Sequence, residues 1–214
     1  MKKNIIIISL LLIGCAHNVQ AQFTQLELFS GLNKTDFTLL SSYAFNESET
    51  LGVNILAFFQ KFRNKENQNF DEIGLQPTIY WNINKYLAIG PSLYYNSVAG
   101  YSQRFSAKYM LKKSRVLFVF MPTVANSEQK RVGYGEAFAQ FQFYIPIDGS
   151  ISLCLNGQFL TVWDRFETHS RSFQQLRLGV SLNGHQIGVG LDLDQYGTQP
   201  INKSSFGFYY RKTL

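Results

Sequence analysis

The chain has 214 residues, of which 45% are hydrophobic and 16% are charged, and its formal net charge is +6 at pH 7. Its lysines and arginines are scattered along the sequence, so the charge does not indicate a nucleic-acid partner. No stretch approaches the roughly 20 consecutive apolar residues of a membrane helix. The two cysteines are Cys15 and Cys154. Because Cys15 falls in an expected export signal, no intramolecular disulfide is predicted.

The first residues predict an export signal. A charged start at residues 1–3 precedes an apolar run at 5–13 and a short polar stretch, which is the order of regions in a secretory signal. Two interpretations remain open: lipidation at Cys15, after Leu-Ile-Gly, or ordinary cleavage after Ala21. The spacing between the apolar run and Ala21 favours ordinary cleavage and a mature chain that begins at Gln22.

Alternation of apolar and polar residues predicts β-strands. Residues 176–182 alternate strictly, Asn183-Gly184 is a strong hairpin signal, and residues 187–193 repeat the alternation. We therefore predict an all-β fold of about twelve strands, with ten still possible, in one domain over 22–214 that follows a signal peptide over 1–21. The predicted strands lie near 23–30, 36–46, 50–62, 70–82, 86–97, 101–112, 114–126, 130–145, 150–163, 171–183, 185–194 and 203–214.

The predicted connections alternate in length. Tight turns are expected at Asn84-Lys85, Lys112-Lys113, 146–150 and Asn183-Gly184, and longer polar loops at 63–70, 125–131, 164–171 and 195–203. Short turns at one end and long loops at the other are typical of an up-and-down antiparallel transmembrane β-barrel.

Three prolines, Pro77, Pro91 and Pro122, fall inside predicted strands, where each removes a donor from the ladder. With a two-residue turn at Asn84-Lys85, Pro77 faces Ser92 and Pro91 faces Thr78. Both prolines then lie at one level of a single hairpin, and we predict a bulge there.

The apolar face of these strands is predicted to face lipid. Twelve strands enclose more space than the side chains of that face can fill, since about eight strands already suffice for a packed interior. Aromatic residues near the predicted strand ends also suit the girdles found at membrane interfaces. The opposite, polar face would then line the interior. Its charged members are Arg104, Lys108, Glu136, Arg177, Asp192, Asp194 and Arg211.

In these features the chain resembles the small outer-membrane β-barrels of Gram-negative bacteria. The last strand adds to the resemblance, because Phe206, Phe208, Tyr210 and Leu214 share one face. The resemblance implies a location in the outer membrane, both termini on the periplasmic side and the long loops outside. It also implies two kinds of partner, outer-membrane lipid and the barrel-insertion machinery.

The sequence displays little catalytic chemistry. Outer-membrane lipid hydrolases of similar architecture place a histidine and a serine two residues apart on one strand face, but Glu167 and Arg171 occupy those positions around His169. We therefore interpret His169 as an exposed loop residue and expect no enzyme activity, cofactor or metal. Asp192 and Asp194 share a strand face, which is compatible with acid–base or calcium chemistry, although a structural ion-pair network is favoured.

Two functions remain open. The interior charges either line a narrow pore for small polar solutes, for example as a basic wall opposite an acidic one, or plug a barrel that anchors or assists a surface or secretion complex. A lipid hydrolase is a third and less favoured alternative, because it needs a nucleophile that the sequence does not display.

Overall fold

A computed structural model describes residues 23–129 and 131–214, so the export signal predicted at 1–21 lies outside the described residues. Over the described residues the chain forms twelve strands and one short 3-10 helix, η1. Their bounds are β1 Phe23–Gly31, β2 Lys34–Ala44, β3 Leu51–Phe62, η1 Lys65–Phe70, β4 Glu72–Asn82, β5 Leu87–Asn96, β6 Gly100–Lys113, β7 Val116–Ser127, β8 Val132–Asp148, β9 Ile151–Asp164, β10 Thr168–Leu182, β11 His185–Tyr196 and β12 Ile201–Thr213.

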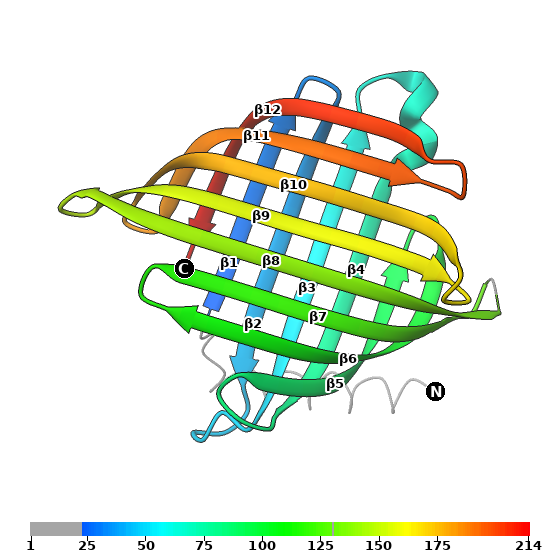
Figure 1. The fold of residues 1–214 in the computed structure, drawn as a ribbon, viewed down its shortest axis with the longest axis horizontal. Coiled ribbons are helices and arrows are strands. Elements are labelled where there is room, and N and C mark those ends of the chain that lie inside the picture. The colour runs from blue at the N-terminus through cyan, green and yellow to red at the C-terminus, as the bar shows by residue number, and fades with distance from the viewer. Residues whose placement is uncertain (1–22, 130) are drawn as a thin grey trace, which may run out of the picture.

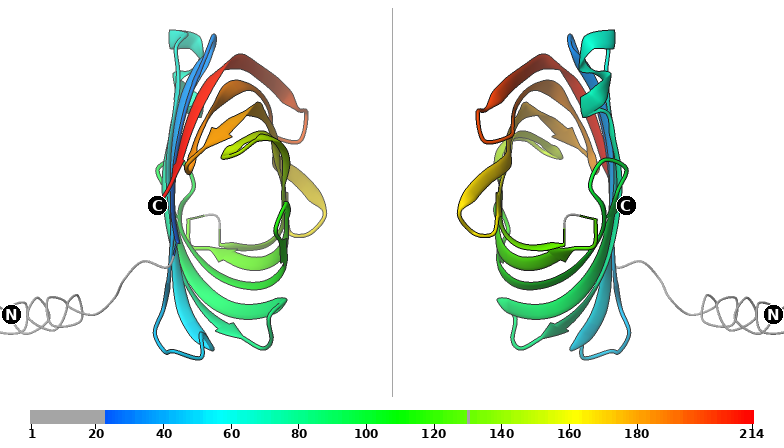
Figure 2. Two further views of the ribbon diagram at one scale, coloured as in Figure 1. Left: turned by 90° about the vertical axis from the view of Figure 1, so that its left-hand side faces the viewer. Right: turned by 90° about the vertical axis from the view of Figure 1, so that its right-hand side faces the viewer.

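Each strand pairs antiparallel with its neighbours in sequence, and β1 pairs with β12 to close the barrel. The predicted fold class is confirmed, with twelve strands in place of the ten-strand alternative. The strands from β6 to β12 cross in front of β1–β4 at a steep angle (Figure 1), and the side views show the ribbon closing into a flattened ring (Figure 2). The beginning of β1 lies beside the end of β12, since the amide of Leu214 donates to the carbonyl of Thr24 over 2.8 Å.

The connections at the end opposite the termini are shorter than predicted. The loops expected at 164–171 and 195–203 reduce to 165–167 and 197–200, because β9 to β12 continue into the polar segments. Alternation fades in those segments, yet their backbone groups still pair across neighbouring strands. The long connection at 63–71 remains, and it holds η1, which Asn64 caps by accepting from the amide of Glu66.

The predicted proline bulge is wrong. The pairs Leu75↔Tyr95, Thr78↔Ser92 and Trp81↔Ile89 keep one register along β4 and β5. The turn spans residues 83–86 instead of two residues, and this shifts the hairpin by one step relative to the prediction. Register shifts occur elsewhere, between Pro146 and Asp148 and between His169 and Arg171.

The outer face of the barrel is apolar and its interior is polar, which is the reverse of a soluble protein. On β10, Leu178 is 47% exposed, whereas its neighbour Arg177 is 2% exposed. The same alternation runs along β11, where Ile187 lies on the exposed face and Asp192 is fully buried. An apolar outer belt around a charged interior is stable only where lipid surrounds the barrel, so the belt is the membrane-facing surface. No helix among the described residues is long and apolar enough to span a bilayer.

A charge introduced into this belt is expected to destabilise the barrel. Leu178→Arg places a guanidinium near the middle of the belt, and we expect the free energy of unfolding in lipid vesicles to fall by about 2–4 kcal/mol. Glu167→Arg, in the connection between β9 and β10, serves as the control and should change it little. Equal stability of the two variants would contradict a lipid-facing belt.

Candidate functional site in the barrel interior

The interior holds a set of buried charges, each contributed by the polar face of a strand. The carboxylates belong to Glu27, Asp36, Glu72, Glu136, Asp192 and Asp194, and each of them contacts a cation within 4.0 Å. Ionised groups removed from water are costly unless a partner of opposite charge and further hydrogen bonds replace the lost solvation. The interior therefore combines charge with local neutrality.

Arg104 and Glu136 form one isolated pair. Arg104 lies on β6 and Glu136 on β8, and Arg104 Nη2 lies 2.8 Å from Glu136 Oε2. Arg104 Nη1 donates to Gln76 Oε1 over 2.8 Å, and Arg104 Nε donates to the hydroxyl of Tyr134 over 3.1 Å. The guanidinium also stacks on Tyr94, 3.9 Å from the ring centroid. These contacts fix the arginine against the wall.

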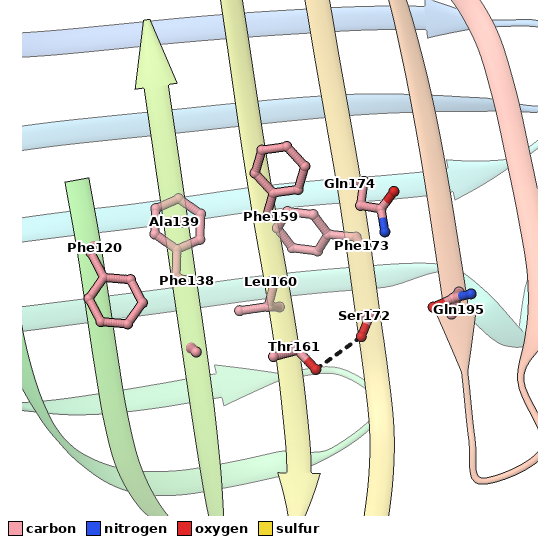
Figure 3. A pocket seen from close by; sticks show the side chains of 11 residues that line it. Phe120, Phe138, Ala139, Phe159, Leu160, Thr161, Ser172, Phe173, Gln174 and Gln195 are labelled. Carbon is pink, nitrogen blue, oxygen red and sulfur yellow. Dashed lines mark hydrogen bonds between the residues drawn. The ribbon is translucent and has the colours of Figure 1, made fainter. Parts of the chain in front are cut away.

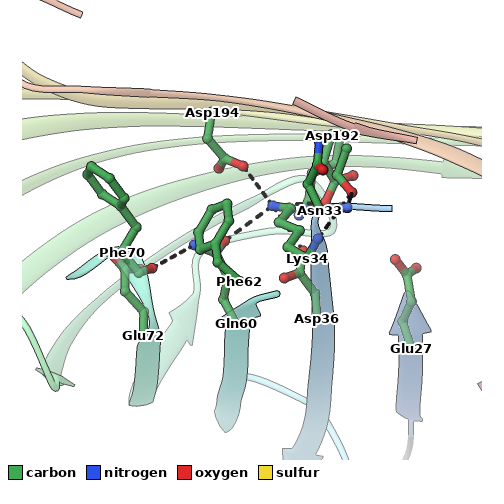
Figure 4. Close-up of polar contacts among 12 residues, drawn as sticks. Glu27, Asn33, Lys34, Asp36, Gln60, Phe62, Phe70, Glu72, Asp192 and Asp194 are labelled. Carbon is green, nitrogen blue, oxygen red and sulfur yellow. Dashed lines mark hydrogen bonds and ion pairs between the residues drawn. The ribbon is translucent and has the colours of Figure 1, made fainter. Parts of the chain in front are cut away.

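A second cluster surrounds Lys34 at the start of β2. Its ammonium lies 3.1 Å from Asp36, 3.0 Å from Asp192 and 2.7 Å from Asp194, and it also donates to Gln60 over 3.2 Å (Figure 4). The Lys34 side chain is 1% exposed. One buried cation thus holds three carboxylates that belong to two different strands.

A third cluster joins β1 to the last strands. Glu27 accepts from Arg177 Nε over 2.9 Å and from Arg211 Nε over 2.7 Å. Arg177 also contacts Asp192, which links this cluster to that of Lys34. Glu27 therefore bridges β1 to both β10 and β12.

The ion pair between Arg171 and Glu72 joins two widely separated strands. Arg171 Nη1 contacts a Glu72 carboxylate oxygen, although β10 and β4 lie on opposite sides of the ring, six positions apart in either direction. The Arg171 side chain is 18% exposed and that of Glu72 is 7% exposed. This ion pair therefore crosses the interior and narrows it near the mouth opposite the termini.

The η1 segment lies at the same mouth. The Phe70 ring packs 4.5 Å from that of Tyr196, and Lys203 donates to Asn67 Oδ1 over 2.6 Å. Gln60 Nε2 donates both to the Phe70 carbonyl, over 3.1 Å, and to the Tyr196 hydroxyl, over 2.9 Å. The connection between β3 and β4 is thereby attached to β11 and β12.

The charges expected at the interior all lie on that face of their strands. Arg104 contacts Glu136, Arg177 contacts Asp192, and Asp194 and Arg211 find partners that the sequence analysis did not include. Lys108 has no carboxylate partner among the described residues and lies 4.1 Å from the ring centroid of Tyr80. The acidic and basic groups are interleaved in contact pairs and do not form two facing walls.

Five interior charges were missed: Glu27, Lys34, Asp36, Glu72 and Arg171. For Glu27 and Glu72 the alternation of their predicted strands was a sufficient signal. Lys34 lies before the predicted start of its strand, and Asp36 was its first residue. Arg171 was the first residue of its predicted strand, in phase with Arg177, and the register shift lies just before it.

A closed barrel with an apolar outer belt and a charged interior defines an outer-membrane β-barrel protein, and the outer membrane is its location. No protein-family model matches the sequence, and no curated protein does. Two solved porin structures share the fold. The NanC porin aligns with a TM-score of 0.54 and 8% identity over 90% of this chain and 98% of its own. The KdgM porin aligns with a TM-score of 0.50 and 7% identity over 90% of this chain and 99% of its own.

Proposed function

We propose that the protein is a narrow pore for small polar solutes, and that passage through this pore involves no catalysis. The observation that carries this proposal is the Arg171–Glu72 ion pair, which links opposite walls of a charged interior. A lining of carboxylates, guanidiniums and amides replaces part of the hydration shell of a passing solute, while a cross-interior bridge limits its size. The shared fold of the two porins supports a channel.

The pairing of opposite charges along the interior affects which solutes the proposed pore can select. Each of the six interior carboxylates contacts a cation, so the lining presents alternating charges and no ring of one sign. Channels that select by the sign of the charge use rings of one charge. The proposed pore therefore discriminates by size and hydrogen bonding more than by the sign of the solute charge.

Conductance in planar bilayers tests the proposal. We expect small, discrete conductance steps and, under a salt gradient, a reversal potential near zero. Heat-dependent gel mobility of the same sample establishes that the barrel is folded. A folded barrel that conducts no ions would support the alternative, a plugged barrel that assists a surface or secretion complex. The attachment of η1 across one mouth is the observation that favours this alternative.

We also propose that export ends with cleavage after Ala21. The closed belt of strands is itself a membrane anchor, so no lipid on Cys15 is required. The intact mass of the protein purified from membranes distinguishes a start at Gln22 from an acylated Cys15.

A further inference from the structure

A histidine and a serine of β10 form a hydrogen-bonded pair on the outer surface of the barrel. His169 Nε2 lies 2.8 Å from Ser172 Oγ, and His169 Nδ1 lies 2.9 Å from the carbonyl oxygen of Gly197. A carbonyl oxygen can only accept, so Nδ1 carries the proton of the neutral ring. The Ser172 hydroxyl then has two acceptors within reach, Nε2 at 2.8 Å and Thr161 Oγ1 at 3.1 Å (Figure 3). When it donates to Nε2, the pair has the arrangement of a nucleophile with an oriented general base.

The register shift in β10 creates this pair. His169 is opposite Trp163, whereas Arg171 is opposite Val162, so Ser170 is the extra residue of a bulge. In a regular strand, residues three positions apart face opposite sides. The bulge brings His169 and Ser172 to the same side. His169 lies in β10, so its interpretation as an exposed loop residue is wrong.

A groove on the outer face begins at Ser172. Its volume is about 240 Å³. Figure 3 shows Thr161, Ser172 and Gln195 at one end and Phe120 and Phe159 further along. The apolar part is hollow because the small side chains of two alanines separate the two rings. These alanines are Ala137 and Ala139.

The serine lies at the polar edge of the lipid-facing belt. Along the outer face of β10, Ser172 and Gln174 are followed by a run of apolar residues at alternate positions, from Leu176 to Leu182. Trp163, whose ring lies 5.6 Å from that of His169, is of the residue type that concentrates at membrane interfaces. The acyl ester groups of membrane lipids lie at a boundary of this kind, between the hydrocarbon core and the headgroups.

From this geometry we infer that Ser172 and His169 form an ester-hydrolysing site on the outer surface of the barrel, whose substrates are fatty acyl esters. The acyl chain lies in the groove, and the ester carbonyl lies at Ser172. Gln174 also lines the groove, and its side-chain amide carries N–H donors of the kind that stabilise an oxyanion. This activity is separate from the proposed pore, because its groups face away from the interior.

The reaction proceeds in two balanced steps. Ser172 Oγ attacks the ester carbonyl carbon while its proton passes to His169 Nε2; the alcohol then leaves with that proton, and an acyl-serine remains. A water molecule next gives a proton to His169 and attacks the acyl carbon. The carboxylic acid departs as Ser172 Oγ regains the proton. The sum is one ester and one water converted to one acid and one alcohol.

Labelling with a fluorophosphonate that carries an alkyl chain tests the site directly. We expect one label on each folded barrel, located at Ser172 by peptide mass spectrometry, and none on Ser172→Ala. Ser181→Ala, which removes a hydroxyl near the other end of β10, should label like the wild type. Labelling of the wild type at another residue, or no labelling of a heat-shifting, folded barrel, would overturn the inference.

Hydrolysis of p-nitrophenyl esters then tests the base and the groove. We expect His169→Gln to lower kcat by about 10²–10⁴-fold, and we expect octanoate to react faster than acetate. Phosphatidylcholine in mixed micelles distinguishes a membrane-lipid substrate from a water-soluble acyl ester, since only the former predicts release of fatty acid. Equal rates for wild type and Ser172→Ala would refute the site whatever the conductance of the barrel.

Discussion

Removing the ion pair that crosses the interior is expected to raise the single-channel conductance several-fold. In Glu72→Gln, Arg171 loses its carboxylate partner and its side chain is released from the opposite wall. The narrowest section then widens, and the ion flux rises accordingly. Planar bilayer recordings of wild type and variant, at the same salt concentration, measure the change.

Glu72→Gln is preferable to a change at Arg171 because Arg171 lies between the two residues of the proposed hydrolytic pair. Lys85→Ala, in the exposed turn between β4 and β5, is the matched control and should keep the wild-type conductance. An unchanged or smaller conductance in a folded Glu72→Gln barrel would show that the bridge is not the constriction. Loss of labelling at Ser172 in that variant would point instead to a general disturbance of β10.

The second large effect is expected on stability. Glu136→Ala leaves Arg104 buried without a carboxylate, since Glu136 is its ion-pair partner in the described interior. Breaking a buried pair by removing one member typically costs about 3–5 kcal/mol, because the remaining charge stays desolvated. We therefore expect a decrease of that size in the free energy of unfolding, measured by urea titration in lipid vesicles with tryptophan fluorescence.

Two comparisons show whether the loss comes from an unpaired charge. The double variant Arg104→Met with Glu136→Met removes both charges and should be considerably more stable than Glu136→Ala. Glu47→Ala, in the exposed connection between β2 and β3, should leave stability unchanged. A Glu136→Ala barrel as stable as this control would mean that Arg104 is solvated in the interior.

The strand pattern was readable from the sequence because its physical cause is local. Alternate residues of a strand meet either lipid or the interior, and the identities at 176–182 and 187–193 follow that choice directly. The same rule explains why charges such as Arg177 and Asp192 could be assigned to the interior. Strand ends were less readable, because beyond the membrane the selection for alternation is weaker.

Contacts across the interior were not readable. Which residue of β10 meets which residue of β4 depends on the stagger of all twelve strands around the ring, and no short stretch of sequence holds that information. The bulge at Ser170 adds a second obstacle. It interrupts the alternation just before Arg171, so that His169 and Ser172 both face outward although they are three positions apart.

Neighbouring residues of β10 serve two surfaces of the barrel. Arg171 reaches the interior bridge, and His169 and Ser172 form the outer pair. Deletion of Ser170 would leave His169 and Ser172 two positions apart, the spacing at which residues of a regular strand share a face, while Arg171 would stay in phase with Arg177. The proposed pore and the proposed hydrolytic site therefore lie on opposite faces of this strand, and their chemistry is independent.

Closure between β1 and β12 has a consequence for biogenesis. The backbone edge of residues 23–31 pairs with residues 207–213, so it stays open until the last strand has been synthesised. Contacts over such a separation form slowly, and unpaired edges are templates for aggregation. A chain that lacks β12 would expose two edges, one on β1 and one on β11, and would lose Arg211 as a partner of Glu27. The finished polypeptide must therefore be protected from self-association during its transit to the membrane.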